Sequence, residues 1–126
     1  MDLIRARFEV FARTGEFDRD AYDSDVTWHL REDLPDSETL VGRDRVGQFF
    51  SQWAGTFEKH RIDVEELIDA GEHVVAVLRF RITIQGSGQE IDMPESWVIK
   101  LADGAVIEGW EYKTKAEALK AAGLEE

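Results

Sequence analysis

The chain has 126 residues, of which 43% are hydrophobic and 33% charged, and its formal net charge is -12. This composition predicts one globular domain over residues 1–126, and the negative charge argues against binding to nucleic acid or to an anionic membrane surface. Because the sequence contains no cysteine, disulfides, thiolate metal sites and cysteine nucleophiles are excluded.

The location of the protein is predicted from the segments that the sequence lacks. Residues 1–14, MDLIRARFEVFART, contain no uninterrupted apolar run of the kind found in a signal peptide. No stretch approaches the roughly 18 apolar residues of a membrane span. We therefore predict a cytoplasmic protein.

The first elements in chain order are predicted to be helical. Ile4, Phe8 and Phe11 recur at helical spacing, and Gly15 is a suitable place for that helix to end. Residues 16–25, EFDRDAYDSD, indicate a short second helix.

A short strand and a polar loop come next, followed by a second long helix. The strand is VTWHL at residues 26–30, the loop covers 31–44, and the helix begins near Arg43. One face of this helix is apolar and strongly aromatic: Val46, Phe49, Phe50, Trp53 and Phe57. Core packing explains the stripe, and the wall of a ligand cavity is the alternative.

The remainder is predicted to be mostly strand. Four strands are separated by turns at Gly71, at residues 86–88 and at residues 103–104. A short C-terminal helix follows, with Thr114 and Glu117 as a capping box and Gly123 just after its end. Helices followed by strands predict an α+β fold, in which a curved antiparallel sheet forms a cone around the N-terminal helices.

An ordered set of segments carries a family resemblance. They are RTGEFD, DVTWH, LVGRDRVGQFFSQW, ELIDAGEHVVAV, VIKLADGAVIEGWEY and AEALKAAGL. Over nearly all of its length the chain resembles a SnoaL-like member of the nuclear-transport-factor-2-like superfamily. The resemblance implies the cone fold and a homodimer. The superfamily includes steroid isomerases, polyketide cyclases, an epoxide hydrolase, a dehydratase and members that only bind or associate, so the fold leaves the function open.

Glu95 is a polar residue in an apolar row. By strand alternation it shares a face with Met93, Trp97, Ile99 and Leu101, which predicts that its carboxyl points into the cone.

The direction of Glu111 depends on the turn at Asp103-Gly104. A two-residue turn pairs Glu95 with Tyr112 and points Glu111 outward. A three-residue turn with a glycine bulge pairs Glu95 with Glu111 and points both carboxyls inward. The residues alone leave both registers open.

The resemblance favours the second register. In limonene-type epoxide hydrolases an acidic catalytic residue precedes a tyrosine of the last strand, as Glu111 precedes Tyr112 here. The arginine and aspartate of that family's preceding strand fall on Glu95 and Trp97, so its triad is not retained. The base of the steroid isomerases falls near Leu30, so their site is not retained either.

Two inward carboxyls would form an acid/base pair, because burial and mutual repulsion raise the pKa of one of them. The hypothesis makes Glu111 the base and Glu95 the acid or its modulator. In the ordinary alternative, Glu95 is a structural residue bonded to Tyr112, His29 or Arg79.

Four aromatic residues are predicted to line the substrate pocket: Trp28, Phe50, Trp53 and Trp97. Aromatic walls suit a small apolar or aromatic ligand. We predict no metal and no cofactor, because the histidines are scattered and the sequence has no phosphate-binding glycine loop. The sequence thus predicts a small-molecule-binding protein and leaves open whether it is an acid/base enzyme or a non-catalytic dimeric binding or interaction module.

Overall fold

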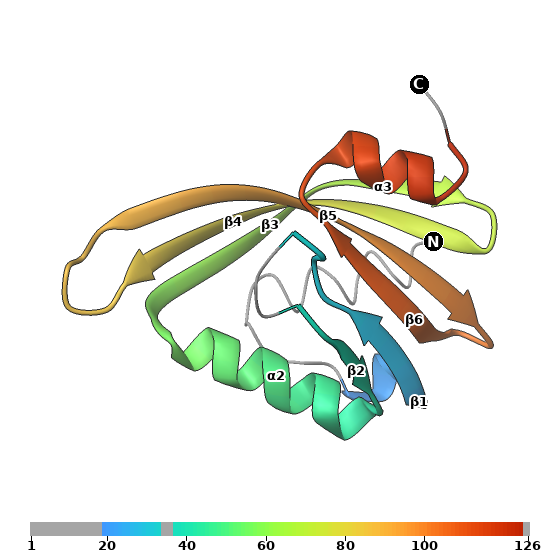
Figure 1. Ribbon diagram of the computed structural model, residues 1–126, viewed down its shortest axis with the longest axis horizontal. Coiled ribbons are helices and arrows are strands. Elements are labelled where there is room, and N and C mark those ends of the chain that lie inside the picture. The colour runs from blue at the N-terminus through green and yellow to red at the C-terminus, as the bar shows by residue number, and fades with distance from the viewer. Residues whose placement is uncertain (1–18, 34–36, 125–126) are drawn as a thin grey trace.

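The computed structural model describes residues 19–33 and 37–124 (Figure 1). Its elements are the 3-10 turn η1 (Arg19–Ala21), β1 (Tyr22–His29), β2 (Thr39–Val41), α2 (Arg43–Gly55), β3 (Phe57–Ala70), β4 (His73–Ile84), β5 (Glu90–Ala102), β6 (Ala105–Tyr112) and α3 (Lys115–Ala121). The helix predicted from Ile4 to Gly15 lies outside the described residues.

The described strands form one curved sheet in the order β2-β1-β6-β5-β4-β3 (Figure 1). All neighbouring pairs are antiparallel except β1 and β6, which are parallel. Helix α2 packs on the inner face, and α3 packs on the outer face (Figure 1). This arrangement is the α+β fold with a curved sheet that the sequence predicts.

Two expectations for the first part of the chain are wrong. Residues 22–25 belong to β1 and not to a second helix, and the predicted loop 31–44 contains β2. The central strand position of β1, between β2 and β6, supplies backbone partners on both sides. That pairing outweighs the local helical preference of the segment, which Asp and Ser residues make weak.

The core lies between α2 and the inner face of the sheet. Val46 and Phe50 of α2 are buried there against Trp28 of β1 and Trp97 of β5. Trp28 and Trp97 are almost completely buried, and their ring centroids are 5.0 Å apart in an edge-to-face arrangement. The aromatic stripe of α2 therefore packs in the core, although its last predicted member, Phe57, begins β3.

The ends of α3 follow the predicted pattern. The Thr114 hydroxyl accepts a hydrogen bond of 3.2 Å from the backbone N–H of Glu117, and Gly123 has a φ of 82° just after the helix. Ala118 and Leu119 are buried against Val75 and Val98 of the sheet. This second, smaller cluster holds the C-terminal helix against the outer face.

Candidate active site

The hairpin between β5 and β6 has a tight two-residue turn. Asp103 and Gly104 have φ values of 53° and 79°, and Ala102 pairs with Ala105. These positive φ values are those of a primed turn, which suits the twist of the strands. At the turn itself, the structure therefore matches the first of the two predicted registers.

A bulge then shifts the register by one residue. Leu101 pairs with Val106, but the preceding Lys100 pairs with Glu108, so Ile107 is an extra residue on β6. Beyond the bulge Trp97 pairs with Glu111, and both predicted pairings of Glu95 are wrong. Because a one-residue shift exchanges the two faces of a strand, Glu111 lies on the inner face beside Trp97.

Glu95 is buried and bonded on both carboxyl oxygens. It is 7% exposed, and its Oε1 accepts a 2.7 Å hydrogen bond from the indole N–H of Trp97. Its Oε2 accepts a longer bond, 3.5 Å, from Nη1 of Arg31. Two of the partners expected in the ordinary alternative have other contacts: His29 contacts Glu108, and Arg79 contacts Glu65 and Asp92.

Glu111 is held by a second tryptophan. Its Oε2 accepts a 2.7 Å hydrogen bond from the indole N–H of Trp28, a residue of β1 that is completely buried. Glu111 itself is partly exposed. Each carboxyl of the pair is therefore fixed by one indole donor, and the two donors stack edge to face in the core.

The environment raises the pKa of both carboxyls. Burial is the main cause for Glu111, the charge of Glu95 adds to it, and together they raise the pKa of Glu111 to about 8. Burial also raises the pKa of Glu95, but its bonds to Trp97 and Arg31 oppose this. A hydrogen bond between the two carboxyls raises the pKa of Glu111 and lowers that of Glu95. Glu95 accepts bonds from Trp97 and Arg31 whereas Glu111 accepts one from Trp28, so the bonding favours the charged form at Glu95 and the protonated form at Glu111.

Arg31 completes the cluster, although no sequence pattern predicts it as a site residue. Its side chain is only 12% exposed, and two of its nitrogens form a fork on the carboxylate of Asp33, with Nε–Oδ1 and Nη2–Oδ2 distances of 2.9 and 2.6 Å. Hydrogen bonding to Asp33 raises the already high pKa of Arg31, so it remains a cation. An arginine in a polar loop gives no periodic signal, and only the folded chain brings it to Glu95.

The four aromatic residues predicted to bind a ligand gather in the core. Phe50 lies 5.6 Å from Trp28 and 5.8 Å from Trp97 between ring centroids, and Trp53 lies 5.4 Å from Phe80. All four belong to the inner cluster, as buried members or packed against it. Their part in ligand binding remains a prediction.

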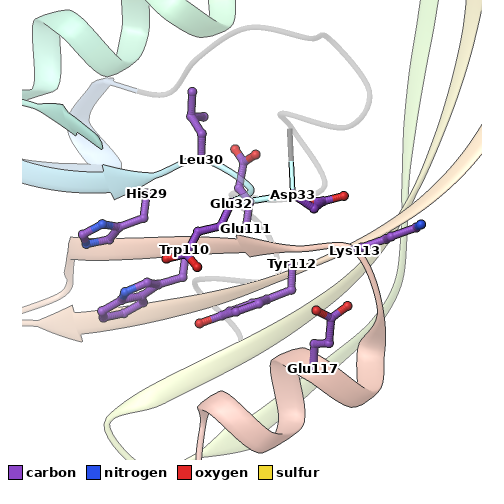
Figure 2. A pocket seen from close by; sticks show the side chains of 9 residues that line it. All are labelled: His29, Leu30, Glu32, Asp33, Trp110, Glu111, Tyr112, Lys113 and Glu117. Carbon is purple, nitrogen blue, oxygen red and sulfur yellow. The ribbon is translucent and has the colours of Figure 1, made fainter. Parts of the chain in front are cut away.

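A pocket of about 170 Å³ lies at the end of β1 and β6, next to the start of α3. Figure 2 shows the nine residues that line it: His29, Leu30, Glu32, Asp33, Trp110, Glu111, Tyr112, Lys113 and Glu117. Trp110 and Tyr112 lie on the same side of β6, and Glu117 approaches from α3 (Figure 2). Glu111 is the member of the carboxyl pair that lines the pocket.

The outer side of β6 holds a different arrangement. Nε2 of His29 lies 2.7 Å from a carboxylate oxygen of Glu108, and Nδ1 lies 3.2 Å from the hydroxyl of Thr39. The His29 ring stacks on Trp110, with centroids 5.4 Å apart and planes inclined by 11°. Both ring nitrogens are thus already bonded to neighbours, which fixes the orientation of the ring.

The part of the chain that the structure describes contains no group of three or more His, Asp or Glu side chains able to hold a metal ion. Among its helices, none has the length and apolar character needed to cross a membrane.

Comparison with solved structures identifies similar folds. An NTF2-like protein from Anabaena variabilis is 18% identical, with a TM-score of 0.74 over 90% of this chain and 88% of that one. An NTF2-like protein of unknown function from Burkholderia pseudomallei is 23% identical, with a TM-score of 0.71 over 95% and 94%. A protein from Catenulispora acidiphila with a ketosteroid isomerase-like fold, solved in complex with trimethylamine, is 15% identical, with a TM-score of 0.71 over 93% and 92%.

At these identities the structural matches show the fold alone, and no curated protein matches the sequence. The family comparison goes further, because the SnoaL-like domain matches residues 4–109. That match covers most of the chain, including Glu95, the bulged residue Ile107 and both tryptophans, Trp28 and Trp97. The chain therefore belongs to the SnoaL-like domain family.

Proposed function

We propose that the protein binds a small molecule and catalyses a proton-transfer reaction on it without a cofactor, with Glu111 as the group that exchanges the proton. The observation that carries this proposal is the pair of inward carboxyls, in which Glu111 has a pKa of about 8 and also lines a pocket. A carboxyl with a pKa near the ambient pH can donate and recover a proton efficiently.

The arrangement suits an isomerisation by proton transfer. Glu111 would donate its proton to a carbonyl oxygen, which leaves two adjacent carboxylates that repel each other. That repulsion makes Glu111 a strong base, so it would recover a proton from the carbon next to the carbonyl. The proton lost by the substrate carbon returns to Glu111, and no oxidant or reductant is needed. The hypothesis drawn from the sequence makes Glu111 the base of the reaction, whereas in this scheme Glu111 acts first as the acid.

Glu95 supports this cycle without having to touch the substrate. It is almost completely buried, and the Trp97 and Arg31 donors favour its charged form. Its negative charge keeps the proton on Glu111 in the resting state. Glu95 is therefore proposed to be the modulator of Glu111, which is one of the two roles that the sequence hypothesis gives it.

The ligand is proposed to be a small apolar or aromatic molecule with a carbonyl or similar oxygen. A volume of about 170 Å³ corresponds to roughly six water molecules, so the pocket admits the reacting end of such a molecule. The Catenulispora relative, which was solved with trimethylamine, supports small-molecule binding in this fold.

A hydrogen-exchange assay tests the proposal without knowledge of the natural substrate. The aromatic ketone 2-tetralone is incubated with the protein in D₂O, and loss of its α-hydrogens is followed by NMR. We expect exchange above the buffer rate, reduced about 100-fold or more in Glu111→Gln and Glu95→Gln. Glu108→Gln is the matched control, because it changes the same residue type on the outer face of β6. Equal rates for the wild type and Glu111→Gln would contradict the proposal.

A non-catalytic dimeric binding or interaction module is the second candidate. The outer face favours it, because Trp110 is only partly buried there and stacks on His29 beside the α3 cluster. Apolar rings at a surface are typical of contacts between protein chains. Sedimentation velocity of the wild type and Trp110→Ser tests this candidate: a dimer that dissociates in the variant supports it, and a monomeric wild type counts against it.

A further inference from the structure

We propose that Asp33 is a positioning residue: it holds the guanidinium of Arg31 away from Glu95 and thereby sets how the carboxyl pair shares its proton. The use of that proton in catalysis rests on the proposed function, but the positioning itself is a property of the fold.

The guanidinium of Arg31 contacts the carboxylates of Asp33 and Glu95 unequally. Asp33 receives two bonds of 2.6 and 2.9 Å, which form a parallel fork, whereas Glu95 receives one contact of 3.5 Å. Charge-assisted bonds between arginine and carboxylate are usually about 2.7–2.9 Å long. Arg31 is therefore fully engaged with Asp33 and only loosely engaged with Glu95.

The solvent exposure of the two carboxylates makes the preference of Arg31 for Asp33 unexpected. The side chain of Asp33 is 47% exposed, while that of Glu95 is 9% exposed. The buried carboxylate has lost more hydration and would gain more from a close cation. The fork on Asp33 thus keeps Arg31 from the position that would best compensate the charge of Glu95.

The pocket beside Glu111 is also lined by the charged or titratable side chains of Glu32, Lys113, Glu117 and His29. Trp28 and Trp97 donate neutral indole N–H groups, Leu78 of β4 pairs opposite Glu95, and Phe50 of α2 packs against Trp97. Arg31 is the cation that acts on both Glu95 and Glu111, and Lys113 acts on Asp33. The effect of Asp33 on the pair therefore passes through Arg31.

The inference predicts that removing Asp33 and removing Arg31 shift the pKa of the carboxyl pair in opposite directions. Removing Asp33 removes a negative charge and frees Arg31 to approach Glu95, so both effects make the carboxyl pair easier to ionise. Removing Arg31 takes away the cation and makes the pair harder to ionise. An ion pair that only holds the loop in place, without acting on the carboxyl pair, would give no shift in either variant.

The two indole N–H groups report the titration directly, because each is bonded to one carboxyl. In ¹H–¹⁵N spectra of the full chain recorded from pH 5 to 10, we expect the midpoint at Trp28 to fall by about one pH unit or more in Asp33→Ala. We expect it to rise by about one unit or more in Arg31→Gln. Arg45→Gln is the control, because it breaks an ion pair with Glu38 in which the side chains are 42% and 50% exposed.

An unchanged or raised midpoint in Asp33→Ala overturns the inference. So does a lowered midpoint in Asp33→Ala together with an unchanged one in Arg31→Gln, because Asp33 would then act by its own charge alone. If Arg31→Gln does not fold, Asp33→Asn decides in its place, because it removes the same charge but keeps an oxygen that can accept a bond from Arg31. A fall in the midpoint as large as in Asp33→Ala would then overturn the inference. The spectra need no substrate, so a failure of the exchange assay with 2-tetralone would leave this result standing.

Discussion

Glu108 and Glu111 lie close together on β6 but on opposite faces of the sheet. Glu108 faces outward, where its side chain is 33% exposed and pairs with His29. Glu111 faces inward, where it bonds to Trp28 and lies beside Glu95. The same residue type on the same strand is thus part of a surface pair on one side and of a proton-sharing pair on the other.

The difference lies in the backbone and not in the side chains. Glu108 is the first residue after the bulge at Ile107, and strand alternation then places Glu111 inside. Without the bulge, the two-residue turn would point Glu111 outward, as the first predicted register has it. The chemical character of the site therefore depends on one extra residue without a functional side chain.

Deleting Ile107 is the most direct way to break this contrast. The deletion should exchange the faces of β6 beyond Val106, so that Glu111 turns outward and Trp110 inward. We expect a loss of more than about 4 kcal/mol in the free energy of unfolding, or a failure to fold, measured by chemical denaturation. Deleting Ser87, in the exposed turn between β4 and β5, is the control. A stable Ile107 deletion that retains the Trp28 titration would refute our account of the bulge.

Gly109→Ala should have the next largest effect. A Cβ at this position would lie 2.1 to 2.8 Å from ring atoms of Trp28, so the ring that holds Glu111 would have to move. We expect destabilisation of about 2–3 kcal/mol and a displaced indole N–H signal for Trp28. Gly55→Ala is a matched control, because no atom lies within 4 Å of its added Cβ. Equal stability of the two variants would be inconsistent with this packing.

Glu111→Gln sharpens the comparison through the pH dependence of stability. The folded pKa of Glu111 is about 8, above its ordinary value of 4.5, so the folded state holds the proton more tightly than the unfolded state. The stabilisation that the Glu111 proton gives the folded state is complete below about pH 4.5 and is lost as the pH rises through about 8.

Above pH 8 the variant should therefore be more stable than the wild type, by roughly 1–2 kcal/mol after allowance for partial exposure. Urea denaturation at pH 6 and pH 9 measures this effect. Parallel pH profiles for the two proteins would contradict it.

Glu108→Gln should have the smallest effect. The pair with His29 is partly exposed, so its loss should change the free energy of unfolding by less than about 1 kcal/mol. The titration observed at Trp28 should be unchanged. A shifted midpoint would show that the two faces of β6 are electrically coupled, against the contrast described above.

Most of the fold could be predicted from the sequence because its longer elements have strong patterns. The alternation in β4 and β5, the positive-φ glycine after β3 and the caps of α3 are local signals, and all agree with the structure. The three residues of β2 are too few for a pattern, and β1 is set by strand pairing. These two elements could not be read from local preference.

The candidate site was only partly predictable, for two physical reasons. A bulge at an isoleucine leaves no mark in composition, although Gly109 is a hint, since glycine inside a strand often marks a bulge or a close contact. Arg31 comes from a loop, and its approach to Glu95 depends on tertiary structure. The inward direction of Glu95 was predictable because its apolar row is long.

The parallel contact between β1 and β6 has a consequence for how the site comes into being. Trp28 and Arg31 arrive from an early part of the chain, while both glutamates arrive from the late hairpin. Loop closure over such a distance is slow, and it precedes any benefit from the contacts it creates. During refolding, the raised pKa of Glu111 should therefore emerge among the last native properties, after the β3–β4–β5 meander has formed.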